Sequence, residues 1–274
     1  MNDPTHVPPG GARIAAALRA AAGGGEPALV AYLTAGFPSR DGFLSQLADV
    51  AAAADVVEIG VPFSDPMADG VTIQRASEQA LRAGVTLRWI LQQLHSLPAL
   101  RTPLLLMSYL NPLLAYGSQL APDAARAGIC GLIVPDLPFD EGAELAAALA
   151  TAWLALVQMV TPVTPPERLA RVAGASQGFV YAVTMTGTTG KSISAPADIG
   201  DYLRRVRAAA QVPVCAGFGI RTREQIEALR GQVDGVIVGS ALVEVLERGE
   251  SASEWLAALR RPRNAGPERA QRPR

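Results

Sequence analysis

Two acidic side chains, Glu58 and Asp69, have the types and the spacing needed for acid–base chemistry. Glu58 lies in the run 55–61, Asp-Val-Val-Glu-Ile-Gly-Val, which has the composition of a strand. Side chains alternate along a strand, so the apolar residues at 57, 59 and 61 share one face, and Glu58 shares the other with Val56 and Gly60. In a barrel the apolar face packs on helices and Glu58 points inside, near the carboxyl end of its strand, where barrel enzymes place catalytic groups. A buried charge is costly unless it is paired, so Glu58 either has a structural partner or carries out chemistry.

The loop after this strand, residues 62–70, places two more carboxylates near the same end of the strand. Its sequence is Pro-Phe-Ser-Asp-Pro-Met-Ala-Asp-Gly, and its two prolines restrict the backbone. Asp65 and Asp69 could act on a ligand or could accept hydrogen bonds from backbone N–H groups of the turn. The turn role is the simpler interpretation for Asp65, whereas Asp69 stays a candidate for chemistry.

Three turns that contain glycine follow the last three predicted strands. They are residues 184–192, residues 217–220 and Gly239-Ser240, which opens a helix. Glycine lets backbone N–H groups approach an anion, and a helix N-terminus adds a favourable dipole, so these turns could bind phosphate. Glycine also closes ordinary turns, and both interpretations stay open. The Gly-Lys-Ser string at 190–192 is not a nucleotide-binding loop, because that pattern requires glycine where Met185 stands.

Composition excludes several kinds of active site. Lys191 is the only lysine, and His6 and His95 are the only histidines among 274 residues. A Ser-His-Asp triad or a multi-histidine metal site cannot be assembled from them, and a Schiff-base enzyme needs an inward lysine, whereas Lys191 lies in a loop. Acid–base chemistry therefore falls to carboxylates, tyrosines or Lys191, and we expect no metal and no cofactor.

Charge and hydropathy narrow the partners and the compartment. The net charge of −1 offers no general attraction to nucleic acid or acidic membranes. No apolar run reaches the roughly 18 residues that a membrane span needs. The two cysteines, Cys130 and Cys215, have apolar or glycine neighbours, so we expect buried free thiols and a cytoplasmic protein.

Short β-rich runs alternate with helical patterns along the chain. The predicted strands are residues 29–34, 56–61, 103–108, 131–134, 155–160, 179–184, 212–216 and 235–238. The predicted helices include residues 42–54, 72–83, 87–97, 140–150, 166–173, 199–209, 223–229 and 240–247. Eight such alternations predict an α/β fold of a single (β/α)8 barrel, the TIM-barrel architecture. A doubly wound open sheet is the alternative, weakened because no Gly-x-Gly-x-x-Gly pattern follows the first strand.

Both ends of the chain differ from the predicted barrel domain, residues 12–259. Residues 1–11 are rich in proline and glycine and are predicted to be a disordered lead. The alanine-rich stretch 14–22 is predicted to be an extra surface helix before the first strand. Residues 260–274 are basic and interrupted by proline, and are predicted to be a flexible tail.

The motifs resemble those of the tryptophan synthase alpha chain family. The acidic stretch 57–70 is similar to the family's signature, and the later similar blocks are residues 72–74, 107–112, 136–138, 187–190, 217–220 and 239–241. These blocks follow the family's order from about residue 32 to about residue 245, so the resemblance covers nearly the whole predicted barrel.

The resemblance implies roles for particular residues. Glu58 and Asp69 match the family's catalytic pair. Positions implied to contact or enclose the substrate are Tyr32, Ile73, Leu106, Tyr109, Ile133, Tyr181 and Phe218, and Tyr32 stands where the family often has phenylalanine. Positions implied to bind the phosphate are Gly190, Gly219, Gly239 and Ser240.

The implied activity is that of a lyase of tryptophan biosynthesis, the retro-aldol cleavage of indole-3-glycerol phosphate to indole and glyceraldehyde 3-phosphate. Glu58 would protonate indole C3 and remove the side-chain hydroxyl proton, and Asp69 would stabilise positive charge at the ring nitrogen. The family's alpha chain passes indole to a beta chain that carries pyridoxal phosphate, which implies an alpha2-beta2 heterotetramer. Two alternatives stay open: a stand-alone lyase that releases indole, and a non-catalytic barrel that regulates a partner.

Overall fold

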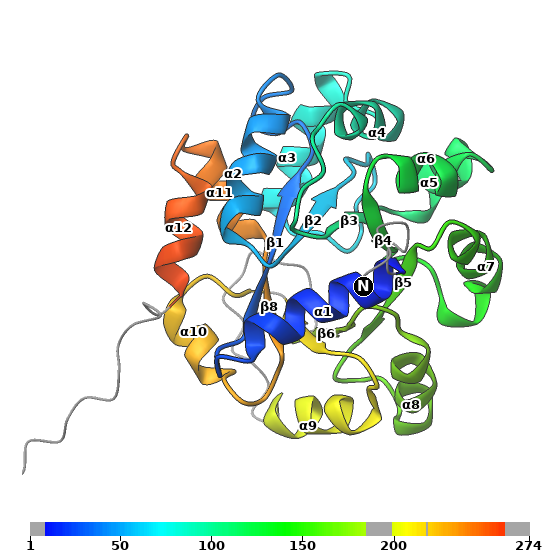
Figure 1. The fold of residues 1–274 in the computed structure, drawn as a ribbon, viewed down its shortest axis with the longest axis vertical. Helices are drawn as coiled ribbons and strands as arrows, with labels where there is room; N and C mark the ends of the chain where they lie inside the picture. Colours follow the sequence, from blue (N-terminus) through cyan, green and yellow to red (C-terminus); the bar gives the residue numbers. More distant parts are fainter. Residues whose placement is uncertain (1–8, 185–198, 218, 261–274) are drawn as a thin grey trace, which may run out of the picture.

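The eight strands are parallel and close into a barrel in which each strand pairs with its neighbours in chain order (Figure 1). The structure is a computed structural model that describes residues 9–184, 199–217 and 219–260. The strands are β1 (Ala28–Thr34), β2 (Val56–Gly60), β3 (Leu104–Met107), β4 (Ile129–Ile133), β5 (Ala155–Val160), β6 (Val180–Val183), β7 (Val214–Gly217) and β8 (Gly235–Val238). The predicted (β/α)8 barrel is confirmed, and every predicted strand is present with ends that differ by only a residue or two.

Helices surround the barrel and connect successive strands (Figure 1). They are α2 (Phe43–Ala53), α3 (Val71–Arg82), α4 (Leu87–His95), α5 (Leu110–Tyr116), α6 (Leu120–Arg126), α7 (Ala143–Thr151), α8 (Pro166–Ala175), α9 (Ile199–Ala209), α10 (Arg223–Ala228), α11 (Ser240–Glu247) and α12 (Ala252–Leu259). The predicted helix at 140–150 is divided, because a 3-10 turn (Phe139–Glu141) precedes Gly142 and α7 follows it. In the described ranges no helix is both long and apolar enough to cross a membrane.

Three helices were not among those predicted: α5, α6 and α12. Both α5 and α6 have only seven residues, and each contains a proline, Pro112 or Pro122, in its first turn. A proline there is tolerated, because the first N–H groups of a helix have no partner within it. Proline is therefore compatible with a helix at these two positions.

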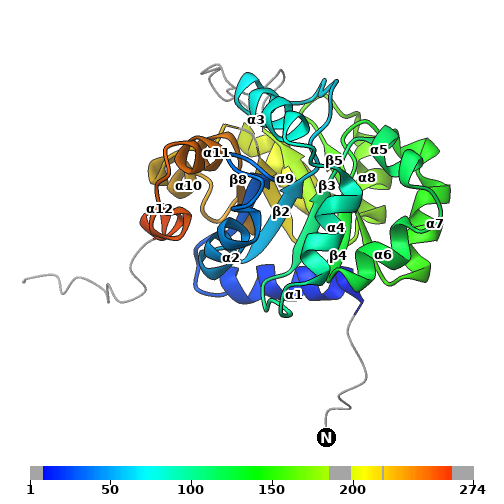
Figure 2. The same ribbon diagram turned by 90° about the horizontal axis from the view of Figure 1, so that it is seen from above.

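The N-terminal helix α1 (Gly10–Ala22) closes the N-terminal end of the barrel (Figures 1 and 2). Its side chains Ile14 and Leu18 are fully buried. A Cβ at Gly10 would stand 1.9 Å from the carbonyl oxygen of Cys130, so the helix begins close against β4. The predicted helix is therefore present and keeps one face exposed, but an alanine-rich segment does not show which of its faces will be covered. Residues 1–8 and 261–274 lie outside the described residues.

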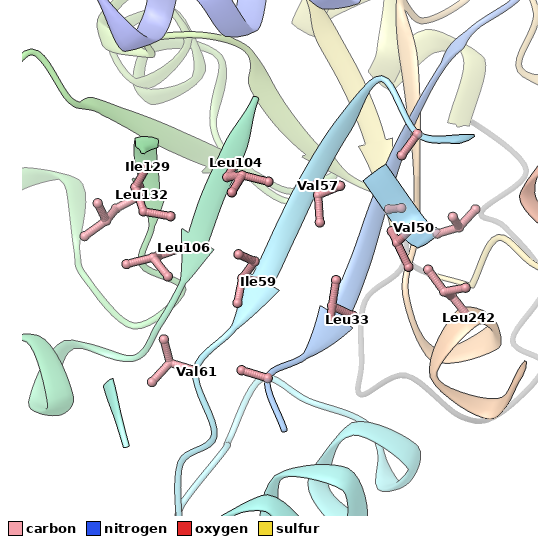
Figure 3. Packing of buried hydrophobic residues seen from close by; sticks show 14 of the residues in the cluster. Leu33, Val50, Val57, Ile59, Val61, Leu104, Leu106, Ile129, Leu132 and Leu242 are labelled. Atoms are coloured by element: carbon pink, nitrogen blue, oxygen red, sulfur yellow. The ribbon is translucent and has the colours of Figure 1, made fainter. Parts of the chain in front are cut away.

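Strand alternation divides the core into two layers. Val57, Ile59 and Val61 pack outward with helix residues such as Val50, as predicted (Figure 3). Inward side chains, among them Val30, Val56, Leu105 and Ile237, form a second cluster with Ile14 and Leu18 of α1. Apolar side chains thus fill the N-terminal end of the barrel, and the polar residues that follow collect at the other end.

Candidate active site

One pocket at the carboxyl ends of the strands brings together most of the residues that the sequence singled out. It is lined by Tyr32, Glu58, Asp69, Ile73, Met107, Tyr181, Gly219, Ile220, Ile237, Gly239 and Ser240. These residues come from five strands (β1, β2, β3, β6 and β8), from the turns after β2, β7 and β8, and from the first turns of α3 and α11, and they lie far apart in the sequence. Closure of the barrel is what places the two carboxylates beside the glycine turns.

Glu58 is an inward side chain of β2 and has no exposed surface. Among the described residues, neither of its carboxylate oxygens has a hydrogen-bond partner. Burial raises the pKa of Glu58 from 4.5 to about 8, because the charged form loses its hydration. A carboxyl group with this pKa can donate a proton near neutral pH and can also accept one.

Asp69 follows β2 in the turn before α3, and its environment is different. The Tyr109 hydroxyl donates a hydrogen bond to Asp69 Oδ2 (3.0 Å) and accepts one from the Ala68 backbone N–H (2.9 Å). The side chain of Gln74 donates to the Asp69 carbonyl and holds the turn (2.9 Å). Burial raises the pKa of Asp69 to about 6, and the bond from Tyr109 opposes that rise. Asp69 is therefore ionised at a pH where Glu58 still holds its proton, so the two carboxyl groups differ in charge near neutral pH.

Two tyrosine rings enter the pocket over glycines. A Cβ at Gly60 would stand 2.1 Å from the Tyr32 phenol oxygen, and one at Gly217 would stand 2.6 Å from the Tyr181 ring. In each case the glycine is on the next strand, two residues along from the partner of the tyrosine. Glycine at these two positions therefore makes room for the phenols beside Glu58.

The glycine turns form the other side of the pocket. Gly219 has a φ of +80°, a conformation that side chains other than glycine rarely adopt. Gly239 precedes α11, and the first N–H groups of that helix, beginning at Ser240, have no partner within it. This arrangement can bind an anion. Gly190 and Phe218, which the sequence also predicted to contact the substrate, lie outside the described residues.

Comparison with known proteins identifies the family to which the chain belongs. The model of the family "Tryptophan synthase alpha chain" matches residues 18–265. The chain belongs to the tryptophan synthase alpha chain family. The alpha chain of Nitratidesulfovibrio vulgaris is 45% identical over 249 residues, 90% of this chain and 97% of that protein. The alpha chain of Bacillus cereus is 42% identical over 257 residues, with coverages of 90% and 98%.

Solved structures agree with the sequence relatives. A chain of Mycobacterium tuberculosis tryptophan synthase superposes with a TM-score of 0.81 at 37% identity, over 91% of this chain and 99% of that chain. The predicted activity is confirmed at the level of the family: this alpha chain is a lyase of tryptophan biosynthesis that cleaves indole-3-glycerol phosphate to indole and glyceraldehyde 3-phosphate.

Leu106, which was predicted to enclose the substrate, lies elsewhere in the barrel. Its side chain is fully buried in the outer layer between β3 and the helices, so it does not reach the pocket (Figure 3). Strand alternation explains this, because Leu105 and Met107 are the inward residues of β3 and Met107 lines the pocket. Ile133 does point inward, but it belongs to the inner apolar cluster and is not a lining residue. Tyr109 reaches the site through its bond to Asp69.

Three lining residues were missed: Met107, Ile220 and Ile237. For Met107 and Ile237 the signal was available, since each has the inward parity of its strand. Ile220 follows the glycine turn after β7, and no periodic signal marks it. In the described part of the alpha chain no three His, Cys, Asp or Glu side chains come together as metal ligands.

Proposed function

We propose that Glu58 is the acid and base of the retro-aldol cleavage and that Asp69 stabilises the charge that develops on the indole ring. The observation that carries this proposal is the carboxyl group of Glu58, fully buried and without a hydrogen-bond partner among the described residues, in the same pocket as Asp69. A buried group left in this state costs stability, and an active site is where such a cost is retained.

The reaction needs one proton transfer to the substrate and one from it, and a single carboxyl group can carry out both. Glu58 first gives its proton to indole C3, and the ring nitrogen acquires positive charge, which the Asp69 carboxylate stabilises. Glu58 then takes the proton of the hydroxyl group next to the scissile bond. The C–C bond breaks, its electron pair returns to the ring, and indole and the aldehyde are formed. Glu58 ends as it began, protonated, so no cofactor is needed.

Substrate orientation follows from the two sides of the pocket. We propose that the N–H groups at Gly219, Gly239 and Ser240 bind the phosphate. The indole then lies toward Ile73, near Asp69, and the Tyr32 and Tyr181 rings border the glycerol chain.

The test is indole release from indole-3-glycerol phosphate. Glu58→Gln and Asp69→Asn keep the shape of the side chain, and each should lower the rate on the order of 10²- to 10⁴-fold. Asp65→Asn is the matched control, because Asp65 is exposed in the same turn and, in the described structure, its side chain accepts a hydrogen bond only from the neighbouring Ser64 hydroxyl. A Glu58→Gln variant with a normal rate would contradict the assignment.

A beta chain that uses pyridoxal phosphate is the proposed partner, in an alpha2-beta2 heterotetramer that receives the indole. Support comes from three exposed apolar side chains, Met67, Leu114 and Val163. They follow β2, β3 and β5, so they lie at the end of the barrel where the pocket opens. Exposed apolar side chains at this end of the barrel would be covered by a partner that docks over the pocket.

Binding of a purified beta chain, measured by calorimetry, tests the partner. Leu114→Asp should weaken binding on the order of tenfold or more. Trp153→Asp is the control, since Trp153 is equally exposed but lies between α7 and β5, at the opposite end of the barrel. Indole release as fast without the beta chain as with it would favour the stand-alone lyase. The two free, buried cysteines support a reducing compartment, and we propose the cytoplasm.

A further inference from the structure

Tyr32 is the strand neighbour of Glu58 on the inner face of the barrel. The two residues are Cα partners in the parallel pairing of β1 with β2. The Tyr32 ring leans toward the pocket mouth, because its phenol oxygen stands where a Cβ of Gly60 would be. Gly60 comes two residues after Glu58 on the same face of β2. The hydroxyl group therefore lies on the mouth side of Glu58, on the path of a carboxyl group that extends toward a substrate.

A second hydroxyl group fixes the phenol. Tyr32 Oη and Thr34 Oγ1 are 3.3 Å apart in a buried pair, and either atom could be the donor. Thr34 is 1% exposed. Two hydroxyl groups carry two protons, and the bond between them uses one. When Thr34 donates to Tyr32, the phenol proton is left for a third group.

Glu58 is the group that needs such a donor when it is ionised. The titratable groups around it are Tyr32 on β1, Tyr181 on β6, Cys215 on β7 and, in the same pocket, Asp69 in the turn after β2. Asp69 can only repel a second carboxylate, and a thiol is a weak donor. Burial and the nearby carboxylates raise the pKa of Tyr32 above its ordinary value, so the phenol keeps its proton at working pH.

We propose that Tyr32, held by Thr34, is a positioning residue that donates a hydrogen bond to the Glu58 carboxylate in the step in which Glu58 acts as a base. No bond to carbon is made or broken at Tyr32, and its proton is shared but not transferred. This inference rests on the proposed role of Glu58. It assigns to Tyr32 a task other than contact with the substrate, and it makes Thr34 part of the same device.

The pH profile of indole release, measured with saturating beta chain, separates this role from a structural one. Glu58 begins the reaction protonated, so its ionisation appears as the loss of activity on the alkaline side. Tyr32→Phe keeps the ring over Gly60 and removes the donor. The carboxylate is then less stable, so the alkaline limb moves to higher pH, and kcat falls about tenfold with little change in KM.

Three further variants complete the test. Thr34→Val should reproduce part of the shift, Thr34→Ser should restore the wild-type profile, and Tyr32→Phe/Thr34→Val should be no worse than Tyr32→Phe alone. Tyr202→Phe is the matched control, because Tyr202 is a buried phenol that donates to the Val160 carbonyl (2.8 Å) outside the pocket. An unmoved alkaline limb in Tyr32→Phe, or additive losses in the double variant, would overturn the inference. A wild type that releases no indole would overturn the proposed function, and this inference with it.

Discussion

Carboxyl groups occur at both ends of this barrel, and their surroundings differ. At the N-terminal end, Asp55 accepts a hydrogen bond from the Leu29 N–H (2.8 Å), and Asp234 accepts one from the Val214 N–H (2.8 Å). Each aspartate stands just before a strand and bonds the beginning of the neighbouring strand. Glu58 is only three residues after Asp55, yet among the described residues it accepts no hydrogen bond.

The difference in hydrogen bonding between Asp55 and Glu58 suggests that one carboxyl group contributes to stability and the other to function. A paired carboxylate at the closed end joins neighbouring strands and favours the folded state. An unpaired carboxyl group at the open end opposes folding when it is ionised, and is free to bind or exchange a proton with a substrate. We therefore expect variants at the closed end to change stability alone, and variants of Glu58 to change activity and stability in opposite directions.

The largest expected effect on stability is the pH dependence that Glu58 imposes. The folded chain holds the Glu58 proton up to a pH of about 8, whereas the reference carboxyl group releases it at 4.5. The stabilisation from this proton is therefore complete below pH 4.5 and is lost as the pH rises through 8. The loss is on the order of 5 kcal/mol. Asp69 adds a smaller loss in the same direction between pH 3.8 and 6.

Urea unfolding of wild type and Glu58→Gln across this pH range measures the effect. The variant should lack most of the decline and should be the more stable protein above pH 8. Glu144→Gln, at an exposed position of α7, is the control and should follow the wild type. If the free energy of unfolding fell with pH in parallel for wild type and Glu58→Gln, Glu58 would not cause the decline and the proposed difference between the two ends would be wrong.

The next largest effect is expected at the closed end. Leu18→Ala removes a fully buried side chain of α1 from the inner cluster and should lower the free energy of unfolding by about 3 kcal/mol. The specific activity of the folded protein should not change, because the pocket is at the other end. Leu81→Ala, at a partly exposed position of α3, should cost much less. Loss of activity in folded Leu18→Ala would show that the two ends are coupled.

Asp55→Ala tests the paired carboxylate itself. It removes the acceptor of the Leu29 N–H and the ion-pair partner of Arg260 (2.7 Å), so both groups lose a bond in a partly buried place. We expect a loss of about 2 kcal/mol and unchanged activity. Exposed Asp41, changed to alanine, provides the comparison. A neutral result would mean that water replaces the carboxylate without cost.

Sequence periodicity predicted the closed end poorly and the open end well. The inward direction of Glu58 followed from alternation along a single strand, and the order of strands and helices followed from composition. The covered face of α1 and the hydrogen bonds of Asp55 and Asp234 depend on segments far away in the sequence, so no local pattern predicted them. That Glu58 lacks a partner is likewise a property of the closed barrel, since it depends on what four other strands place near it.

The errors in the predicted site residues also came from the arrangement of strands, which a local pattern does not give. Leu106 came from similarity to a family position, without a check of its parity against Leu105 and Met107. The Tyr32–Thr34 pair could have been suggested by parity, because both are inward on β1, but the approach to Gly60 depends on the register between two strands. The pairing register of two strands in a parallel barrel depends on how all the strands close into the barrel, so the sequence of either strand alone does not predict it.

The smallest effect is expected from Asp234→Asn, and it sharpens the contrast most. The amide oxygen of asparagine can still accept the Val214 N–H, so the bond between strands survives. Only the attraction to Arg207 is lost, across 3.6 Å and in contact with water, which contributes less than about 1 kcal/mol. Asp234→Ala should cost more than Asp234→Asn, because it removes the acceptor as well. If the two variants were equally unstable, the ion pair and not the backbone bond would be what matters there. Glu58→Gln is the same replacement of an acid by its amide, and there we expect the shape of the side chain to survive while the activity is lost. An acid that tolerates its amide is a hydrogen-bond acceptor, and an acid that does not must exchange its proton or carry its charge.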